Sequence, residues 1–174
     1  MLGKASVFLI GPMGSGKTAV GRQLARSLGL PFYDSDAEIE RRTGVDIPFI
    51  FEKEGEAGFR EREREAIETL TAIEGIVLAT GGGAVLLAEN RRHLASRGRV
   101  VYLETSIAQQ AHRVRHGRNR PLLSSGDTPA RLGELMEARA PLYREIADFV
   151  VATDGRHVRH VAEQVLRELG TERC

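Results

Sequence analysis

The stretch GPMGSGKT, Gly11 to Thr18, lies between the apolar run SVFLI and a segment with helical character. It fits the pattern G-x-x-x-x-G-K-[ST] of a P-loop, whose backbone N–H groups point at phosphate oxygens while the following helix adds its positive dipole end. Glycine residues let the backbone curl in this way. Lys17 can reach the β- and γ-phosphates, and the Thr18 hydroxyl can ligate magnesium. The motif therefore predicts a nucleotide site made by Gly14, Ser15, Gly16, Lys17, Thr18 and Ala19.

Short apolar runs alternate with longer amphipathic stretches along the chain. The runs are rich in β-branched and aromatic residues and predict strands at 6–10, 30–34, 76–80, 99–103 and 148–153. Helices are predicted at about 17–28, 36–42, 57–73, 87–96, 106–115, 129–146 and 157–169. Strands separated by helices imply a parallel sheet covered on both faces. We therefore predict an α/β fold of three layers around a five-stranded parallel sheet, as one domain over residues 1–174.

An absent motif, the chain length and the net charge narrow the class of P-loop protein. A GTPase would usually carry an N-K-x-D motif, which the sequence lacks, and 174 residues are very few for a mechanical ATPase. A small-molecule kinase fits better, because it needs only a phosphate cradle, an acceptor pocket and a lid. The 25 basic and 24 acidic residues leave a net charge of +1, which argues against a general nucleic-acid binder.

Cysteine content and hydropathy bear on the compartment. The single cysteine, Cys174, excludes a disulfide framework or a cysteine metal site and fits a reducing cytosol. No apolar run approaches the 18 residues of a membrane-spanning helix. The N-terminal segment MLGKASVFLIG is too short for a signal peptide. We expect a cytoplasmic monomer with neither a membrane nor a nucleic acid as partner.

Acidic residues follow the second predicted strand, in PFYDSDAEIE at 31–40. Ser35 with Glu38 three residues later fits a capping box that starts a helix. Asp34 ends the strand that we expect beside the P-loop strand, where its carboxylate could face magnesium through water. Asp36 lies in the first helical turn and could accept the proton of a substrate hydroxyl. Both aspartates could instead be favourable acids at a helix N-terminus with no chemical role.

The segment GFREREREAIETL, at 58–70, alternates in charge. Such a run is often a solvated helix whose surface ion pairs contribute little. At about 100° per residue, however, Arg60 lies at the edge of the apolar arc and Glu63 falls inside it. We therefore predict a partly buried Arg60–Glu63 pair that holds the guanidinium in place. A fixed arginine at a pocket wall suits a carboxylate ligand, because its fork matches two oxygens.

Three glycines, Gly81 to Gly83, follow a predicted buried strand in TGGGAV. Three consecutive glycines cost conformational entropy when they become ordered. They could form a loose connector to the next helix. Alternatively, a ligand lies against the bare backbone, where any Cβ would collide with it.

The motifs GPMGSGKT, DSD, FRERE, TGGGAV, RNRPLL and ARAPLY occur in this order along roughly residues 5–167. Together they make the chain resemble the shikimate kinase family of the small bacterial type. The resemblance implies a P-loop kinase fold with a mobile lid at about 112–125 and a substrate-binding helical region at about 34–62. It further implies transfer of phosphate from ATP, with Mg²⁺, to the 3-hydroxyl of shikimate in aromatic amino acid biosynthesis.

The resemblance also implies a role for each matching residue. On the nucleotide side it assigns Lys17 and Thr18 to phosphate and magnesium, Asp34 to the metal, Arg120 to the transferring phosphate and Arg113 to the adenine. On the acceptor side it assigns the substrate hydroxyls to Asp36, the carboxylate to Arg60 and Arg139, and the ring to Gly81, Gly82 and Gly83. Catalysis would then depend on Lys17, Asp36 and Arg120.

One feature departs from the family pattern. Family members often place a proline near the adenine, late in the chain, where DGRHVRH (154–160) has Val158, so Arg156 is the candidate for this contact. The basic segment HRVRHGRNRPLLSSG (112–126) predicts a cationic flap over triphosphate rather than a nucleic-acid patch, since it lacks interleaved aromatic residues. A gluconate-type kinase, a nucleoside monophosphate kinase and a non-catalytic ATP-sensing module remain the alternatives.

Overall fold

The computed structural model describes residues 5–115 and 128–171, whose strands form a single sheet in the order β2-β3-β1-β4-β5. All neighbouring strands are parallel. The strand bounds are β1 Val7–Ile10, β2 Phe32–Asp34, β3 Val77–Ala79, β4 Arg99–Glu104 and β5 Phe149–Ala152. The five strands predicted from the apolar runs are confirmed, and each lies within two residues of its predicted bounds.

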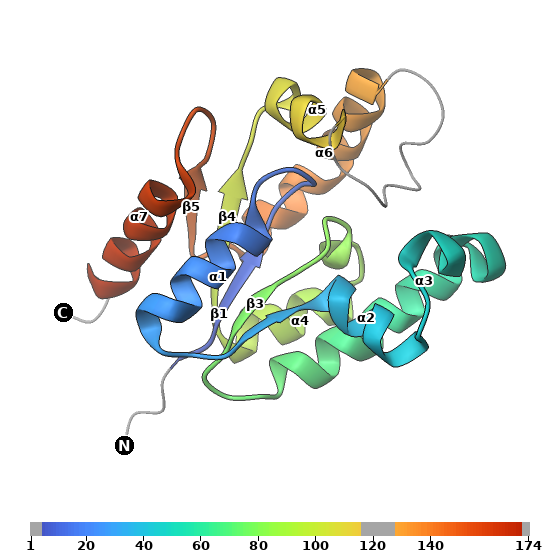
Figure 1. Ribbon diagram of the computed structural model, residues 1–174, viewed down its shortest axis with the longest axis horizontal. Helices are drawn as coiled ribbons and strands as arrows, with labels where there is room; N and C mark the ends of the chain where they lie inside the picture. The colour runs from blue at the N-terminus through green and yellow to red at the C-terminus, as the bar shows by residue number, and fades with distance from the viewer. Residues whose placement is uncertain (1–4, 116–127, 172–174) are drawn as a thin grey trace.

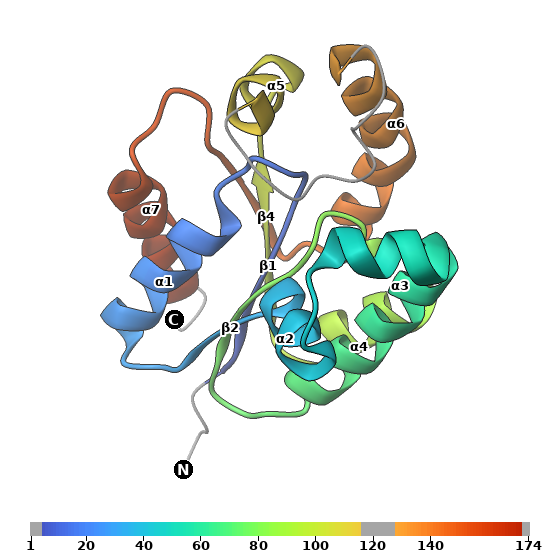
Figure 2. The ribbon, with the colours of Figure 1, turned by 45° about the vertical axis from the view of Figure 1, so that its right-hand side comes forward.

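Helices cover both faces of this sheet, as Figures 1 and 2 show from two directions. The helix bounds are α1 Lys17–Leu28, α2 Ser35–Thr43, α3 Ile47–Thr71, α4 Ala88–Arg97, α5 Ile107–Arg115, α6 Thr128–Ile146 and α7 Val158–Thr171, with a short 3₁₀ helix, η1, at Ala84–Leu86. Helices α1 and α7 pack on one face, while α3, α4 and α6 pack on the other. The predicted three-layer α/β architecture is therefore confirmed.

The two halves of the core follow from the alternation of side chains along β1. Val7 and Leu9 pack with apolar residues of α1 and α7, whereas Phe8 and Ile10 pack with those of α3, α4 and α6. Successive side chains of a strand point to opposite faces, so a strand covered by helices on both sides must be apolar at every position. The uninterrupted run VFLI meets this requirement, and all of its residues are buried.

One expectation about strand order is wrong. Asp34 ends β2, which we expected to lie beside the P-loop strand, but β3 occupies that place and separates β2 from β1. The order of strands is set by how each crossover passes over the sheet, which local residue patterns do not encode. Because all strands are parallel, the end of β2 nevertheless reaches the same edge of the sheet as the P-loop.

Helix α3 begins ten residues before the helix that we predicted from residue 57. Its N-terminus is signalled by Asp46, whose carboxylate accepts a hydrogen bond from Phe49 N at 3.0 Å, and by the proline that follows at Pro48. Gly55 interrupts the helix with a φ of 72°, so the periodicity on its two sides is out of phase. This kink explains why the pattern predicted only the second part.

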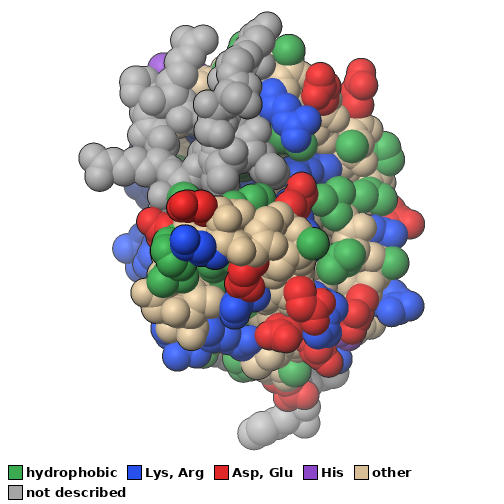
Figure 3. Space-filling view, turned by 90° about the vertical axis from the view of Figure 1, so that its right-hand side faces the viewer, with side chains coloured by type: hydrophobic (Ala, Val, Ile, Leu, Met, Phe, Trp, Pro, Cys, Tyr) green, Lys and Arg blue, Asp and Glu red, His purple; other side chains and the backbone are tan. Residues whose placement is uncertain are grey.

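Charged side chains of both signs intermingle on the face that carries α3 (Figure 3). Arg64 pairs with Glu61 at 2.7 Å and with Glu68 at 3.1 Å, and Arg62 pairs with Glu54 at 2.9 Å. Such exposed pairs contribute little to stability, so this part of the charge run is a solvated helix surface. Within residues 5–115 and 128–171, no helix is both long and apolar enough to cross a bilayer.

Candidate active site

The P-loop leads from β1 into α1 in a conformation that needs its glycines. Gly11, Gly14 and Gly16 have φ values of 148°, 77° and 87°, which other residues rarely adopt. A Cβ on Gly11 would also lie 2.5 Å from the carbonyl oxygen of Leu103. The first turn of α1 carries no acidic residue, so its positive dipole end is left for an anionic ligand.

Lys17 lies inside this loop. Its ammonium donates hydrogen bonds to the carbonyl oxygens of Gly11, at 2.7 Å, and Pro12, at 2.8 Å. These bonds keep a largely buried cation at the mouth of the loop, where phosphate oxygens could replace the carbonyls. Arg113 of α5 reaches the loop from the other side and donates to the Gly14 carbonyl oxygen at 2.6 Å.

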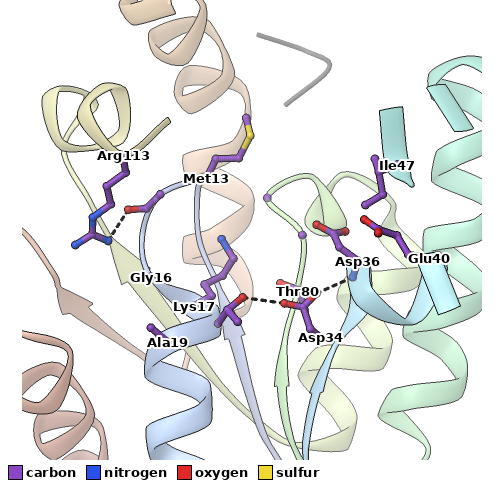
Figure 4. Close-up of a pocket in the computed structure, with 14 residues that line it drawn as sticks. Met13, Gly16, Lys17, Ala19, Asp34, Asp36, Glu40, Ile47, Thr80 and Arg113 are labelled. Carbon is purple, nitrogen blue, oxygen red and sulfur yellow. Dashed lines mark hydrogen bonds between the residues drawn. The ribbon is translucent and has the colours of Figure 1, made fainter. Parts of the chain in front are cut away.

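A cavity of about 440 Å³ opens between the P-loop and the first turns of α2 and α3 (Figure 4). Asp36 and Glu40 of α2 point into it from the side opposite Lys17 and Arg113. Its walls are made by Met13, Gly14, Gly16, Lys17, Thr18, Ala19, Asp34, Asp36, Glu40, Ile47, Thr80, Gly81, Gly82 and Arg113. The cavity thus combines most of the predicted nucleotide residues with the predicted acceptor carboxylate, Asp36, and with two glycines of the predicted acceptor side, Gly81 and Gly82.

Asp34 links the P-loop helix to α2. One carboxylate oxygen accepts hydrogen bonds from the backbone N–H groups of Asp36, at 2.9 Å, and Ala37, at 3.1 Å, and so caps α2. The other accepts from the Thr18 hydroxyl at 2.8 Å. A hydroxyl and a carboxylate meeting at the cavity wall are the hard oxygen donors that Mg²⁺ prefers, so these two residues fit the predicted metal site.

The predicted capping box of Ser35 and Glu38 is wrong. Asp34 is the cap, and Ser35 is instead a fully buried residue of the first turn. Its hydroxyl accepts a hydrogen bond from Gly81 N at 3.1 Å, which ties α2 to the glycine turn. Hydrogen bonds from Arg41 lower the pKa of Glu38 to about 2, with Arg42 adding to the effect, so this carboxylate serves ion pairs within α2.

The predicted pair of Arg60 and Glu63 is present on α3. Arg60 Nη1 lies 2.9 Å from Glu63 Oε1, and the side chain of Glu63 is 1% exposed. Burial raises the pKa of Glu63, while the adjacent guanidinium opposes that rise. The pair is therefore a fixed part of the interior, unlike the solvated pairs of the same helix.

Arg139 of α6 is buried without a matching carboxylate. Its side chain belongs to a residue that is 4% exposed, and in the described part of the chain no acidic group lies within ion-pair distance of it. The Nε atoms of Arg139 and Arg60 have no hydrogen-bond partner there either. Burial lowers the pKa of Arg139 and the nearby Arg60 adds to the effect, while Tyr143, Glu63 and Glu56 oppose it. Buried cations with unused donors mark a place where an anion would be stabilising.

The glycine turn, Gly81 to Gly83, brings these charged groups together. A Cβ on Gly81 would lie 2.8 Å from Asp36 Oδ1 and 3.0 Å from Glu63 Oε2. A Cβ on Gly83 would lie 2.6 Å from Arg60 Cζ, and one on Gly82 would lie 3.5 Å from Arg139 Nη1. Gly83 has an ordinary φ of −97°, so the need here is for space. The site's own side chains thus occupy the room that we had expected a ligand to take.

Two further predicted residues, Ser15 and Arg156, are not among those that line the cavity. Arg156 does not line the cavity, and its guanidinium donates to the carbonyl oxygen of Ala152 at 2.8 Å and to Gln164. Ser15 is buried within the loop, where its hydroxyl accepts a hydrogen bond from Lys17 Nζ at 3.4 Å. Arg120 and most of the predicted lid lie outside the described residues. The adenine contact of Arg156 and the phosphate contact of Arg120 stay predictions.

A protein-family model described as Shikimate kinase matches residues 13–170. The chain belongs to the shikimate kinase family. A shikimate kinase from Methylococcus capsulatus is 57% identical over 166 residues, which cover 95% of this chain and 93% of that relative. The recognition made from the motifs is therefore confirmed.

Solved structures agree with this assignment. Shikimate kinase from Acinetobacter baumannii in complex with shikimate has a TM-score of 0.95 at 47% identity and covers 97% of this chain and 94% of that chain. A gluconokinase from Sinorhizobium meliloti, with a TM-score of 0.61 at 20% identity over 96% of this chain and 92% of that chain, shares the fold alone.

Sequence reasoning missed several residues of this shikimate kinase site. Glu40 lies one helical turn after Asp36 on α2, so the i, i+4 rule could have placed it on the cavity wall. Tyr143 likewise follows Arg139 by four residues, and its hydroxyl donates to the Gly82 carbonyl oxygen at 2.5 Å. No local signal predicts that Met13 and Ile47 line the cavity, because they come from separate segments.

We predict that Gly83→Ala destabilises the protein by about 1–3 kcal/mol, because the new Cβ forces Arg60 away from the buried Glu63 carboxylate. The matched control is Gly133→Ala in α6, where an added Cβ meets nothing within 4 Å. That change should be neutral or stabilise by up to about 1 kcal/mol through helix propensity. Urea unfolding measures both, and equal stabilities of the two variants would contradict the packing described here.

Proposed function

We propose that this chain transfers the γ-phosphoryl group of ATP to the 3-hydroxyl of shikimate, giving shikimate 3-phosphate and ADP for aromatic amino acid biosynthesis. The observation that carries the proposal is the buried Arg139 guanidinium, which lies against the glycine turn at the P-loop cavity and has no ion-pair partner among the described residues. The Acinetobacter baumannii relative, solved in complex with shikimate, supports the choice of acceptor.

The charges beside the glycine turn favour an acceptor that carries one carboxylate. Arg60 is paired with Glu63 at 2.9 Å, so the positive charge of Arg139 is left to attract an anion. Both guanidiniums keep N–H donors free in the described structure. A bound carboxylate would accept these donors and neutralise the buried cation, which is a strong, charge-assisted interaction. Neutral sugars could not supply this compensation.

Asp36 is the group that we assign to the reacting hydroxyl. It projects from the first turn of α2 into the cavity and faces the P-loop across it (Figure 4). In this role the carboxylate orients the acceptor hydroxyl toward the terminal phosphorus and takes its proton as the O–P bond forms. Because transition states of phosphoryl transfer tend to be loose, orientation contributes more than base strength.

The P-loop side would hold the phosphates. Lys17 would exchange the carbonyl oxygens of Gly11 and Pro12 for β- and γ-phosphate oxygens and so meet the charge that spreads over them during transfer. Thr18 and Asp34 would hold magnesium, which supplies further neutralisation of phosphate charge when bound. Arg113, anchored on Gly14, would border the adenine. Arg120 at the transferring phosphate, a monomeric state and a cytoplasmic location remain predictions from the sequence.

A coupled assay of ADP release tests the proposal against its rivals. We expect turnover with shikimate and none above background with gluconate or AMP, because only shikimate offers both a ring hydroxyl for Asp36 and a carboxylate for Arg139. A gluconate-type or nucleoside monophosphate kinase would show the reverse preference. Tight ATP binding without turnover of any acceptor would indicate an ATP-sensing module instead.

Arg139→Ala should raise the shikimate KM by about 100-fold or more, since one charge-assisted contact with the carboxylate is lost. The KM for ATP should change less than about threefold, because the phosphates are assigned to Lys17 and the P-loop rather than to Arg139. Arg131→Ala is the matched control on the same helix: its side chain is 43% exposed and pairs with Glu134 at the surface. Equal losses for both substrates in Arg139→Ala would point to a structural role.

Asp36→Asn should lower kcat by about 100-fold or more while ATP affinity stays within about threefold, since the amide neither orients the hydroxyl as the carboxylate does nor takes its proton. Asp46→Asn is the control, because Asp46 caps α3 and asparagine caps equally well. Steady-state kinetics and ATP titration measure the two effects. A normal kcat in Asp36→Asn would show that the assigned role is wrong.

A further inference from the structure

Tyr143 occupies an unusual position in the interior of the protein. It lies on α6, one helical turn after Arg139, and is fully buried. Its hydroxyl donates a hydrogen bond to the Gly82 carbonyl oxygen at 2.5 Å, and its ring stacks on Tyr102 with centroids 5.0 Å apart. The hydroxyl of this buried tyrosine therefore joins α6 to the backbone of the glycine turn.

The glycine turn and η1 are held by side chains from three directions. Ser35 of α2 accepts from Gly81 N, at 3.1 Å, and Asn90 of α4 donates to the Ala84 carbonyl oxygen, at 3.0 Å. Arg91 of α4 donates to the carbonyl oxygens of Val85, at 2.7 Å, and Leu86, at 3.1 Å. The third direction is α6, from which Tyr143 bonds to the turn and which also carries Arg139.

We propose that Tyr143 is a positioning residue that sets the place of Arg139 relative to Gly82 and thereby the affinity for the carboxylate of the acceptor. The inference rests on the proposed function, because it assigns the acceptor carboxylate to Arg139. Tyr143 bonds to the glycine turn and does not belong to the residues that line the P-loop cavity, so we assign its effect to Arg139.

The geometry supports a coupling of this kind. Residues four apart on a helix lie on one face, so the hydrogen bond of Tyr143 fixes the same side of α6 from which Arg139 extends. A Cβ on Gly82 would lie 3.5 Å from Arg139 Nη1, so the guanidinium and the hydroxyl meet the same residue of the turn. Arg139 itself has no carboxylate partner in the described structure that could orient it. The tyrosine hydroxyl supplies the missing constraint.

Tyr102, in the same cluster, is a tyrosine that contributes packing without a hydrogen bond from its hydroxyl. It is also fully buried and stacks against Tyr143, but its hydroxyl has no hydrogen-bond partner among the described residues. Phenylalanine at 102 would therefore lose no hydrogen bond. Phenylalanine at 143 would fill the same space but leave the Gly82 carbonyl oxygen without its donor, which lets the turn and α6 shift relative to each other.

The test compares Tyr143→Phe with Tyr102→Phe in steady-state kinetics and thermal unfolding. We expect Tyr143→Phe to raise the shikimate KM by about 5- to 20-fold, while the ATP KM stays within about twofold. Tyr102→Phe should leave both KM values within about twofold. Both variants should unfold cooperatively. A Tyr143→Phe variant that changes both KM values equally, or that fails to fold, would overturn the positioning role in favour of a structural one.

A double-mutant cycle separates this inference from the proposed function. In an Arg139→Ala background, Tyr143→Phe should raise the shikimate KM less than about twofold, because the residue through which it acts is gone. An equal increase in both backgrounds would overturn the inference alone. If the wild type turns over shikimate but Tyr143→Phe leaves the shikimate KM unchanged, the inference is also overturned and the proposed function stands. Absence of shikimate turnover in the wild type would overturn the proposed function and the inference with it.

Discussion

Two guanidinium groups, the buried Arg139 and the largely buried Arg60, lie against one glycine turn, and among the described residues only Arg60 has a buried carboxylate, Glu63, within ion-pair distance. Burial of an uncompensated charge is costly, and a folded protein keeps such a group where a ligand compensates it. The surrounding structure serves this arrangement. The turn lacks side chains because Arg60, Asp36 and Glu63 occupy the space that they would need. The absence of Cβ atoms in the turn is therefore as necessary for the site as the charged groups themselves.

Asp34 and Ser35 join the phosphate side of the site to the acceptor side, because each contacts two elements. Asp34 caps α2 with one carboxylate oxygen and meets Thr18 of the P-loop helix with the other. Ser35 begins α2 and holds the glycine turn through Gly81 N. Because each of these contacts lies at the carboxyl edge of the parallel sheet, a small movement of α2 would alter the phosphate side and the acceptor side together.

Much of the fold could be predicted from local patterns. The apolar runs identify all the strands of the described sheet, since a strand covered on both faces must be apolar throughout. Helix α3 shows the limit of such patterns: Gly55 breaks its periodicity, and the first part was missed. Ser35 shows another limit. Its spacing to Glu38 fits a capping box, but a contact 46 residues away, to Gly81, determines what its hydroxyl does.

The sequence by itself determined the P-loop, the identity of the family and the Arg60–Glu63 pair, because each depends on neighbouring residues or on one helical face. Only the tertiary structure decided that β3 separates β2 from β1, that Arg139 has no ion-pair partner in the described part of the chain, and that Tyr143 holds the Gly82 carbonyl. These features join residues that are distant in the chain. Their energies depend on burial and on which groups meet across the core, and neither is encoded in the spacing of residues along a single segment.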